Sequence, residues 1–268
     1  MAQGLKGDAV DTFWTGTSYL LTCAVFQPFI VSLSDIFGRP QLLLFSVVIF
    51  TIGTAVACTA KNFTELFAGR SVQGVGGGGI TALAIVIFTD IIPLRWRPTY
   101  YGVIQAAWAA GTMTGPLFGG LFADRSTWRW VFYINFPFCL IGVVIVPFVI
   151  RLHVERGSLR DRILHTVDWV GAFLFIGSTT SLLIGTSWGG QNYAWGSTQT
   201  IIPIVVGLIG IMTTLYWEFV GTKTPFMRPW LFKDISSVLA FGCSMLQGLL
   251  VGALFLPYQG LAYISRCS

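Results

Sequence analysis

Long apolar stretches alternate with short polar connections along almost the whole chain. A helix needs about 20 mostly apolar residues to cross the hydrocarbon core of a bilayer. Strands of a membrane barrel would be about ten residues long and would alternate in polarity, so the pattern predicts an all-α membrane protein. About eight stretches qualify as membrane helices: 12–34, 42–60, 65–92, 100–123, 130–150, 168–188, 200–220 and 236–258.

The composition agrees with a chain that is solvated mainly by lipid. Of its 268 residues, 54% are hydrophobic and only 10% are charged, whereas soluble domains average about 25% charged residues. Because this small number of charges cannot cover a water-facing surface, we expect a lipid bilayer to surround the chain. The net charge of +5 does not predict nucleic-acid binding, because the basic residues lie in the connections between apolar stretches.

The basic residues of the connections also predict the orientation in the membrane, since Lys and Arg concentrate in cytoplasmic loops. The richer side holds ten of them, and we expect it to be cytoplasmic: Arg39, Arg95, Arg97, Arg151, Arg156, Arg160, Arg162, Lys223, Arg228 and Lys233. The other side holds four: Lys6, Lys61, Arg125 and Arg129. The two long charged connections, 151–167 and 221–235, are then cytoplasmic, and a start on the outer side suggests that a preceding span is absent.

Cysteine and histidine give no sign of a metal or cofactor. None of the five cysteines forms a C-x-x-C pair, and four lie inside apolar stretches, whereas metal and disulfide frameworks need close, repeated spacings. His153 and His165 share one connection without a cysteine or carboxylate cluster. We therefore expect no metal, no cofactor and, because no nucleophile–base pair appears, no enzymatic centre.

Arg70 is the one charge that lies well inside a predicted span. A charge within a membrane helix costs about 2.5–3.5 kcal/mol on insertion scales and marks function by default. Helical spacing places Gln73, Gly74 and Gly77 on the same face. Arg70 must therefore face a polar cavity or a partner in the bundle, unless it extends to the outer interface as long basic side chains do.

A run of glycines follows Arg70 within the same predicted helix, from Gly74 to Gly79. It matches G-x-G-x-x-G, but a dinucleotide site needs a preceding strand and a later acidic residue, and this match lies inside an apolar helix. Glycines in membrane helices let a second backbone approach closely. We expect Gly74 and Gly78 to form such a face.

A second glycine pattern occupies the predicted span 100–123. Gly111, Gly115 and Gly119 recur at every fourth residue, and Gly120 follows the last of them. Pro116 removes a backbone donor and is expected to bend the helix. The pattern favours either a smooth face on which a neighbouring helix rocks or slides, or static tight packing.

A short turn joins the first two predicted spans, and charged residues bracket it. Asp35 precedes Gly38 and Arg39, and Pro40 follows. An acidic side chain at such a turn can pair with a basic residue or with a helix N-terminus, whose dipole is positive. It can equally be a solvated cap.

These three stretches together resemble the signature motifs of the major facilitator superfamily, in the same order and on corresponding spans. They are 33–40 (LSDIFGRP), 66–74 (LFAGRSVQG) and 111–120 (GTMTGPLFGG). The last one matches the antiporter motif G-x-x-x-G-P-x-x-G-G at every fixed position. Four further stretches resemble the fungal fourteen-span drug:proton antiporter branch: 90–93 (DIIP), 128–137 (WRWVFYINFP), 168–171 (DWVG) and 188–190 (WGG).

By this resemblance the chain holds about spans two to nine of fourteen. Residues 1–150 would form the N-terminal six-helix bundle without its first span. Residues 151–235 would hold a cytoplasmic loop, an inserted helix pair and a second loop, and 236–268 would begin the C-terminal bundle. The sequence departs from the family at Val31 and Pro40, where a glycine and a basic residue are usual, and after Pro257.

The resemblance implies a secondary transporter that exports drugs, toxins or other small molecules in exchange for protons by alternating access. Arg70 and Gln73 would couple protons to substrate; Gly111, Gly115, Pro116, Gly119 and Gly120 would set the export direction; Asp35, Gly38 and Arg39 would form the cytoplasmic gate. No protein partner is implied, and the plasma membrane or the vacuolar membrane would be the location. Two alternatives stay open: an importer or facilitator of the same fold, such as a siderophore carrier, and a fragment that does not transport.

Overall fold

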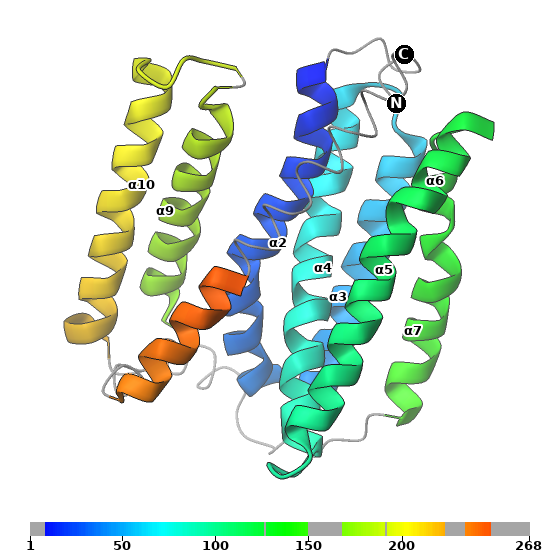
Figure 1. Cartoon of the computed structure of the whole chain (residues 1–268), viewed down its shortest axis with the longest axis horizontal. Helices are drawn as coiled ribbons and strands as arrows, with labels where there is room; N and C mark the ends of the chain where they lie inside the picture. The colour runs from blue at the N-terminus through cyan, green and yellow to red at the C-terminus, as the bar shows by residue number, and fades with distance from the viewer. Residues whose placement is uncertain (1–8, 126, 150–167, 191, 223–233, 248–268) are drawn as a thin grey trace.

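The computed structural model describes residues 9–125, 127–149, 168–190, 192–222 and 234–247, and it folds them into helices (Figure 1). The connection 151–167, most of 221–235 and the chain after 247 lie outside the described residues. The helices, in chain order, are α2 (Ala9–Phe37), α3 (Arg39–Thr59), α4 (Phe63–Ile91), α5 (Arg97–Arg125), α6 (Trp130–Tyr133), α7 (Asn135–Val149), α9 (Trp169–Trp188), α10 (Thr198–Tyr216), the π-helical turn η1 (Trp217–Gly221) and a short helix at Ile235–Gln247.

Successive long helices run in alternating directions (Figure 1). The start of α3 and the end of α4 lie together, because Arg39 forms an ion pair with Asp90. At the opposite end Arg129, next to α6, contacts the end of α3. The alternation therefore places Arg39 and Arg95 at one end of the bundle, and Lys61 and Arg129 at the other.

This arrangement gives a direct test of the predicted orientation. Arg95 and Lys61 are both exposed and lie in connections at opposite ends. With the native cysteines removed, we expect a cysteine at position 95 to react with an impermeant maleimide only after the cells are opened. A cysteine at position 61 should react in intact cells. The reverse result would invert the topology.

Six of the described helices are long and apolar enough to cross a membrane, where the sequence predicted about eight. They are Val10–Phe37, Arg39–Thr59, Phe63–Ile91, Trp130–Phe148, Trp169–Trp188 and Thr198–Gly221. Helix α5 has 29 residues, but its tyrosines, threonines and glycines lower its hydropathy, and it is not among the six. The last predicted span, 236–258, lies partly outside the described residues, and its described part is the short helix Ile235–Gln247.

Helix α4 is wedged between α2 and α3, and its glycines allow this close approach. A Cβ atom on Gly78 would lie 2.5 Å from the carbonyl oxygen of Cys23 in α2. A Cβ atom on Gly76 would lie 2.7 Å from the carbonyl oxygen of Ser46 in α3. Gly74 also meets the α2 backbone, so the predicted close-packing face of Gly74 and Gly78 is confirmed. Lipid is as apolar as leucine, so such packing, rather than exclusion of water, holds membrane helices together.

Helices α9 and α10 form a tight hairpin beside α2 (Figure 1). Gly207 of α10 lies against the backbone of Leu182 in α9, where a Cβ atom would approach to 2.6 Å. The Ser181 hydroxyl donates to the Pro203 carbonyl oxygen at 2.9 Å. The hairpin reaches α2 through an edge-to-face contact of Trp169 with an aromatic ring of α2, Phe29, at 5.7 Å between ring centroids.

Candidate functional site

Arg70 lies in the second turn of α4 and faces the interior of the bundle. Its Nη1 donates to Gln73 Oε1 at 2.6 Å, and its Nε donates to the carbonyl oxygen of Thr15 in α2 at 3.0 Å. Gln73 is only 2% exposed, and its Nε2 donates to Thr54 Oγ1 in α3 at 2.9 Å. Residues three apart on a helix share a face, so the sequence correctly placed Gln73 beside Arg70.

Two aromatic rings complete the surroundings of the Arg70 guanidinium. Its central carbon lies 4.5 Å from the ring centroid of Tyr19 in α2, and 5.9 Å from that of Phe132 in α6. Both distances fall within the range of cation–π attraction. Arg70 therefore contacts α2 and α6 directly, and it connects to α3 through Gln73.

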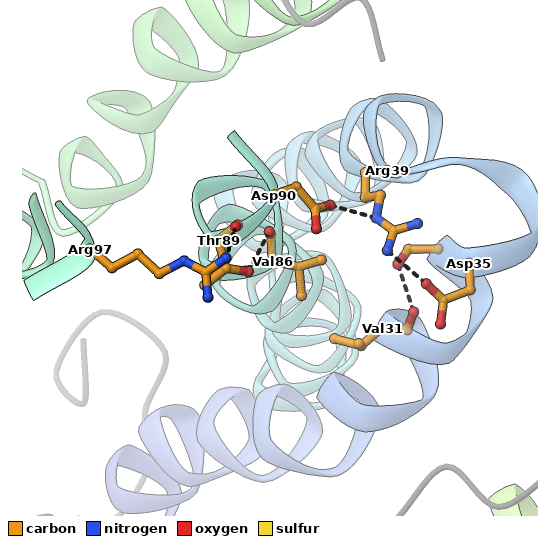
Figure 2. Close-up of polar contacts among 8 residues, drawn as sticks. Val31, Asp35, Arg39, Val86, Thr89, Asp90 and Arg97 are labelled. Atoms are coloured by element: carbon orange, nitrogen blue, oxygen red, sulfur yellow. Dashed lines mark hydrogen bonds and ion pairs between the residues drawn. The ribbon is translucent and has the colours of Figure 1, made fainter. Parts of the chain in front are cut away.

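At the other end of the bundle, Arg39 connects two acidic side chains (Figure 2). Its Nη2 lies 3.0 Å from Asp35 at the end of α2, and its Nε lies 2.8 Å from Asp90 at the end of α4. Gly38 adopts a φ of 92° between α2 and α3, a conformation that side chains disfavour. The turn thus brings Asp35 and Arg39 together as the sequence suggested, and Asp90 joins them from α4.

Arg97 holds the end of α4 next to these charges (Figure 2). Its Nη2 donates to the carbonyl oxygen of Thr89 at 2.7 Å, and its Nε donates to that of Ile92 at 3.1 Å. The last carbonyls of a helix have no partner within it, and basic side chains often satisfy them. Arg97 therefore fixes the end of α4, the turn that carries Asp90.

We expect the two ion pairs of Arg39 to differ in strength. The Asp35 side chain is 60% exposed, whereas the Asp90 side chain is 35% exposed and joins the start of α3 to the end of α4. A double-mutant cycle with Arg39→Gln and Asp90→Asn should give a coupling of about 0.5–1 kcal/mol, as partly exposed pairs do. The cycle with Asp35→Asn should give less. Unfolding in mixed micelles measures both, and equal couplings would contradict this ranking.

The glycine motif of α5 lies on an open face. Among the described residues, and apart from the backbone of α5 itself, no heavy atom comes within 4 Å of the Cβ position at Gly111, Gly115 or Gly119. Pro116 and Gly120 lie in the same helix. Within the described part of the chain, the expected close approach of a second helix is therefore not formed. The spacing makes a smooth face but does not supply the helix that packs on it.

A buried carboxylate that the sequence reasoning did not find lies at the end of α10. Glu218 is 3% exposed and belongs to the π-helical turn η1, near the end of the predicted span 200–220. Beside it Asp168 accepts from Gly171 N at 2.8 Å, which caps α9, and from Trp217 Nε1 at 2.9 Å. A Cβ atom on Gly171 would lie 3.1 Å from Glu218 Oε1, so this glycine makes room for the carboxylate.

The long apolar helices and the polar contacts between them define a multi-pass helical membrane protein. The chain matches the Major Facilitator Superfamily over residues 1–265 and belongs to this family. It is 42% identical over 259 residues, 96% of the chain, to MFS transporter L2 of Phoma sp., of which it covers 43%. It is 37% identical over 246 residues, 91% of the chain, to MFS-type transporter gkaD of Penicillium citrinum, of which it covers 42%.

A third relative is named as an efflux pump. The chain is 34% identical over 239 residues, 89% of its length, to Efflux pump FUS6 of Gibberella moniliformis, of which it covers 41%. The chain thus spans about two fifths of the length of the curated relatives that it matches. The family, and the fungal transporters and efflux pump among the relatives, agree with the resemblance of the sequence motifs.

Proposed function

We propose that this chain is part of a carrier that exports small molecules in exchange for protons by alternating access. The family and the efflux pumps among the relatives support export. The observation that supports proton coupling is the position of Arg70. It is a positive charge inside the bundle that is held by a glutamine, a carbonyl oxygen and aromatic rings. Transport, and no covalent reaction, is the proposed activity.

Arg70 and Gln73 are the proposed coupling residues. In the described residues, the contacts of Arg70 are with uncharged groups. An arginine lowers the pKa of a carboxylate that approaches it, because it stabilises the ionised form. A carboxylate that pairs with Arg70 in one conformation and leaves it in the other would therefore release and rebind a proton. Gln73 and Thr54 would hold the guanidinium in place meanwhile.

Asp35, Gly38 and Arg39 are the proposed gate on the cytoplasmic side, together with Asp90. Their ion pairs join the ends of α2, α3 and α4. Partly exposed pairs of this kind are weak, so they can break and form again during a transport cycle. In this proposal the α2–α3 turn closes on α4 in one state and separates from it in the other.

The open glycine face of α5 is proposed to set the direction of transport, with Gly111, Gly115, Pro116, Gly119 and Gly120 as its residues. Small residues let membrane helices pack and slide closely. The chain itself would form most of an N-terminal bundle at 1–150 and an inserted helix pair within 151–235, and 236–268 would begin a second bundle. The plasma membrane is the proposed location, and the vacuolar membrane is the alternative.

Inside-out vesicles distinguish this exporter from an importer or facilitator. The test uses a chimeric carrier, in which this chain replaces the matching segment of a fungal relative with a measurable substrate. An acidic vesicle interior should drive accumulation of that substrate above the external concentration. A facilitator would only equilibrate it. Accumulation that is the same with and without the pH gradient would reject the proton-coupled mechanism.

A further inference from the structure

The turn that carries Trp128, Arg129, Trp130 and Phe132 lies between α5 and α7, at the end of the bundle opposite to the Asp35–Arg39 turn. It includes the single-turn helix α6. Trp128 and Phe132 point inward and are 9% and 3% exposed, whereas Trp130 between them is 50% exposed. The turn therefore has one face against the bundle and one face away from it.

Arg129 fastens this turn to α3. Its Nε donates to the carbonyl oxygen of Cys58 and its Nη2 to that of Ala60, each at 3.0 Å. These are carbonyls at the C-terminal end of α3, where helix carbonyls need partners and the helix dipole favours a positive charge. The guanidinium also lies over the Trp128 ring, 4.6 Å from its centroid. A lysine could not make both hydrogen bonds in this fork geometry.

Phe132 extends from the fastened turn toward Arg70. It packs in a buried cluster with Ala57 and Cys58 of α3 and Leu66 of α4, and its ring lies 5.9 Å from the Arg70 guanidinium carbon. Tyr19 lies on the guanidinium as well, at 4.5 Å. Two aromatic rings therefore contact Arg70, one from α2 and one from the turn.

We propose that this turn is a cover over the Arg70 site, that Arg129 holds it closed on the end of α3, and that Phe132 is the side chain that shields Arg70. Both act as positioning residues, since they act through Arg70. The cover itself stands on the contacts above, whereas its part in transport rests on the proposed function. The cover keeps water at this end of the bundle away from the guanidinium while Arg70 holds its contacts with α2 and with Gln73.

Cys58 reports on the cover, because it is buried in the cluster beneath it. The chain is purified with its other cysteines replaced by serine and placed in nanodiscs, where a maleimide reaches both faces. Arg129→Gln and Phe132→Ala should each speed the reaction of Cys58 about tenfold, which corresponds to the loss of one to two good contacts. Phe132→Tyr should react as slowly as the parent, and Arg129→Lys should be intermediate.

Trp130→Ala is the matched control, since it removes an exposed ring from the same turn. It should leave the reaction of Cys58 unchanged. A second variant of the chain retains Cys23 as its one cysteine, and Cys23 lies at the α2–α4 interface. Unchanged labelling of Cys58 in Arg129→Gln would overturn the cover. An equal rise at Cys23 would also overturn it, because the whole bundle would then have loosened.

The role in transport is measured separately in the chimeric carrier. Phe132→Ala should shift the pH dependence of export while Trp130→Ala does not, and Phe132→Tyr should restore the parent profile. An unshifted profile with increased Cys58 reactivity would reject the role in transport and leave the cover in place. A carrier that ignores the pH gradient would reject the proposed function, and the Cys58 rates would still decide whether the cover exists.

Discussion

Replacing Arg70 by alanine should lower pH-driven export by the chimeric carrier about 10- to 100-fold while leaving the protein in the membrane. The substitution removes the donors to Gln73 Oε1 and to the carbonyl oxygen of Thr15. Hydrogen bonds to a charged group contribute about 1.5–3 kcal/mol. A loss of that free energy corresponds to the expected fall of about 10- to 100-fold. Proton-coupled uptake into inside-out vesicles, normalised to the amount of carrier, measures the effect.

Two variants make this result specific to Arg70. Arg95→Ala removes an exposed arginine from a connection and should export normally. Arg70→Lys keeps the charge but loses the planar set of donors, and should retain only part of the activity. Normal export by Arg70→Ala would show that the arginine is only a structural contact between helices, and the proposed coupling site would be wrong.

The second large effect should come from a leucine at Gly76, which we expect to destabilise the chain by several kcal/mol or to prevent its folding. A Cβ atom there would lie 2.7 Å from both Phe50 Cα and the carbonyl oxygen of Ser46. Overpacking commonly costs about 1–3 kcal/mol, and here the obstacle is backbone, which cannot rotate away. Thermal denaturation in detergent measures the loss.

Gly115→Leu is the matched control for this prediction. In the part of the chain that the structure describes, a Cβ atom on Gly115 has no neighbour within 4 Å outside the backbone of α5, so the stability of the chain should change by less than about 0.5 kcal/mol. In the chimeric carrier, however, we expect Gly115→Leu to stop export and Gly115→Ala to be milder, since alanine still permits close packing. Near-normal export by both would remove any mechanical role of the α5 motif.

The sequence predicted the parts of this structure that depend on local spacing. Apolar length located most of the helices, and the three-residue interval placed Gln73 beside Arg70. The sequence could not predict that Tyr19 and Phe132 contact Arg70, because those contacts depend on how α2 and α6 are rotated against α4. Asp90 was missed as a partner of Arg39 for the same reason, since 51 residues separate them.

The two glycine patterns show that a sequence pattern alone does not predict which helix packs on it. Gly74 and Gly78 pack closely against a second helix as predicted, and that helix is α2. Gly111, Gly115 and Gly119 have the same spacing, but among the described residues no neighbouring helix comes within 4 Å of them. A small-residue pattern describes one surface only, and its partner is decided elsewhere in the fold. Glu218 was overlooked because its span is apolar overall and the π-helical turn that buries it leaves no clear pattern in the sequence.

The most direct test of the account is substrate-dependent proton movement by the chimeric carrier. Inside-out vesicles are acidified, the interior pH is followed with a fluorescent probe, and the substrate of the recipient carrier is added. We predict that the substrate makes the interior less acidic as protons leave in exchange, and that the Arg70→Ala variant shows no such change. Substrate uptake without any proton movement would contradict the proposed exchange of substrate for protons, and equal proton movement in the Arg70→Ala variant would contradict the proposed role of Arg70.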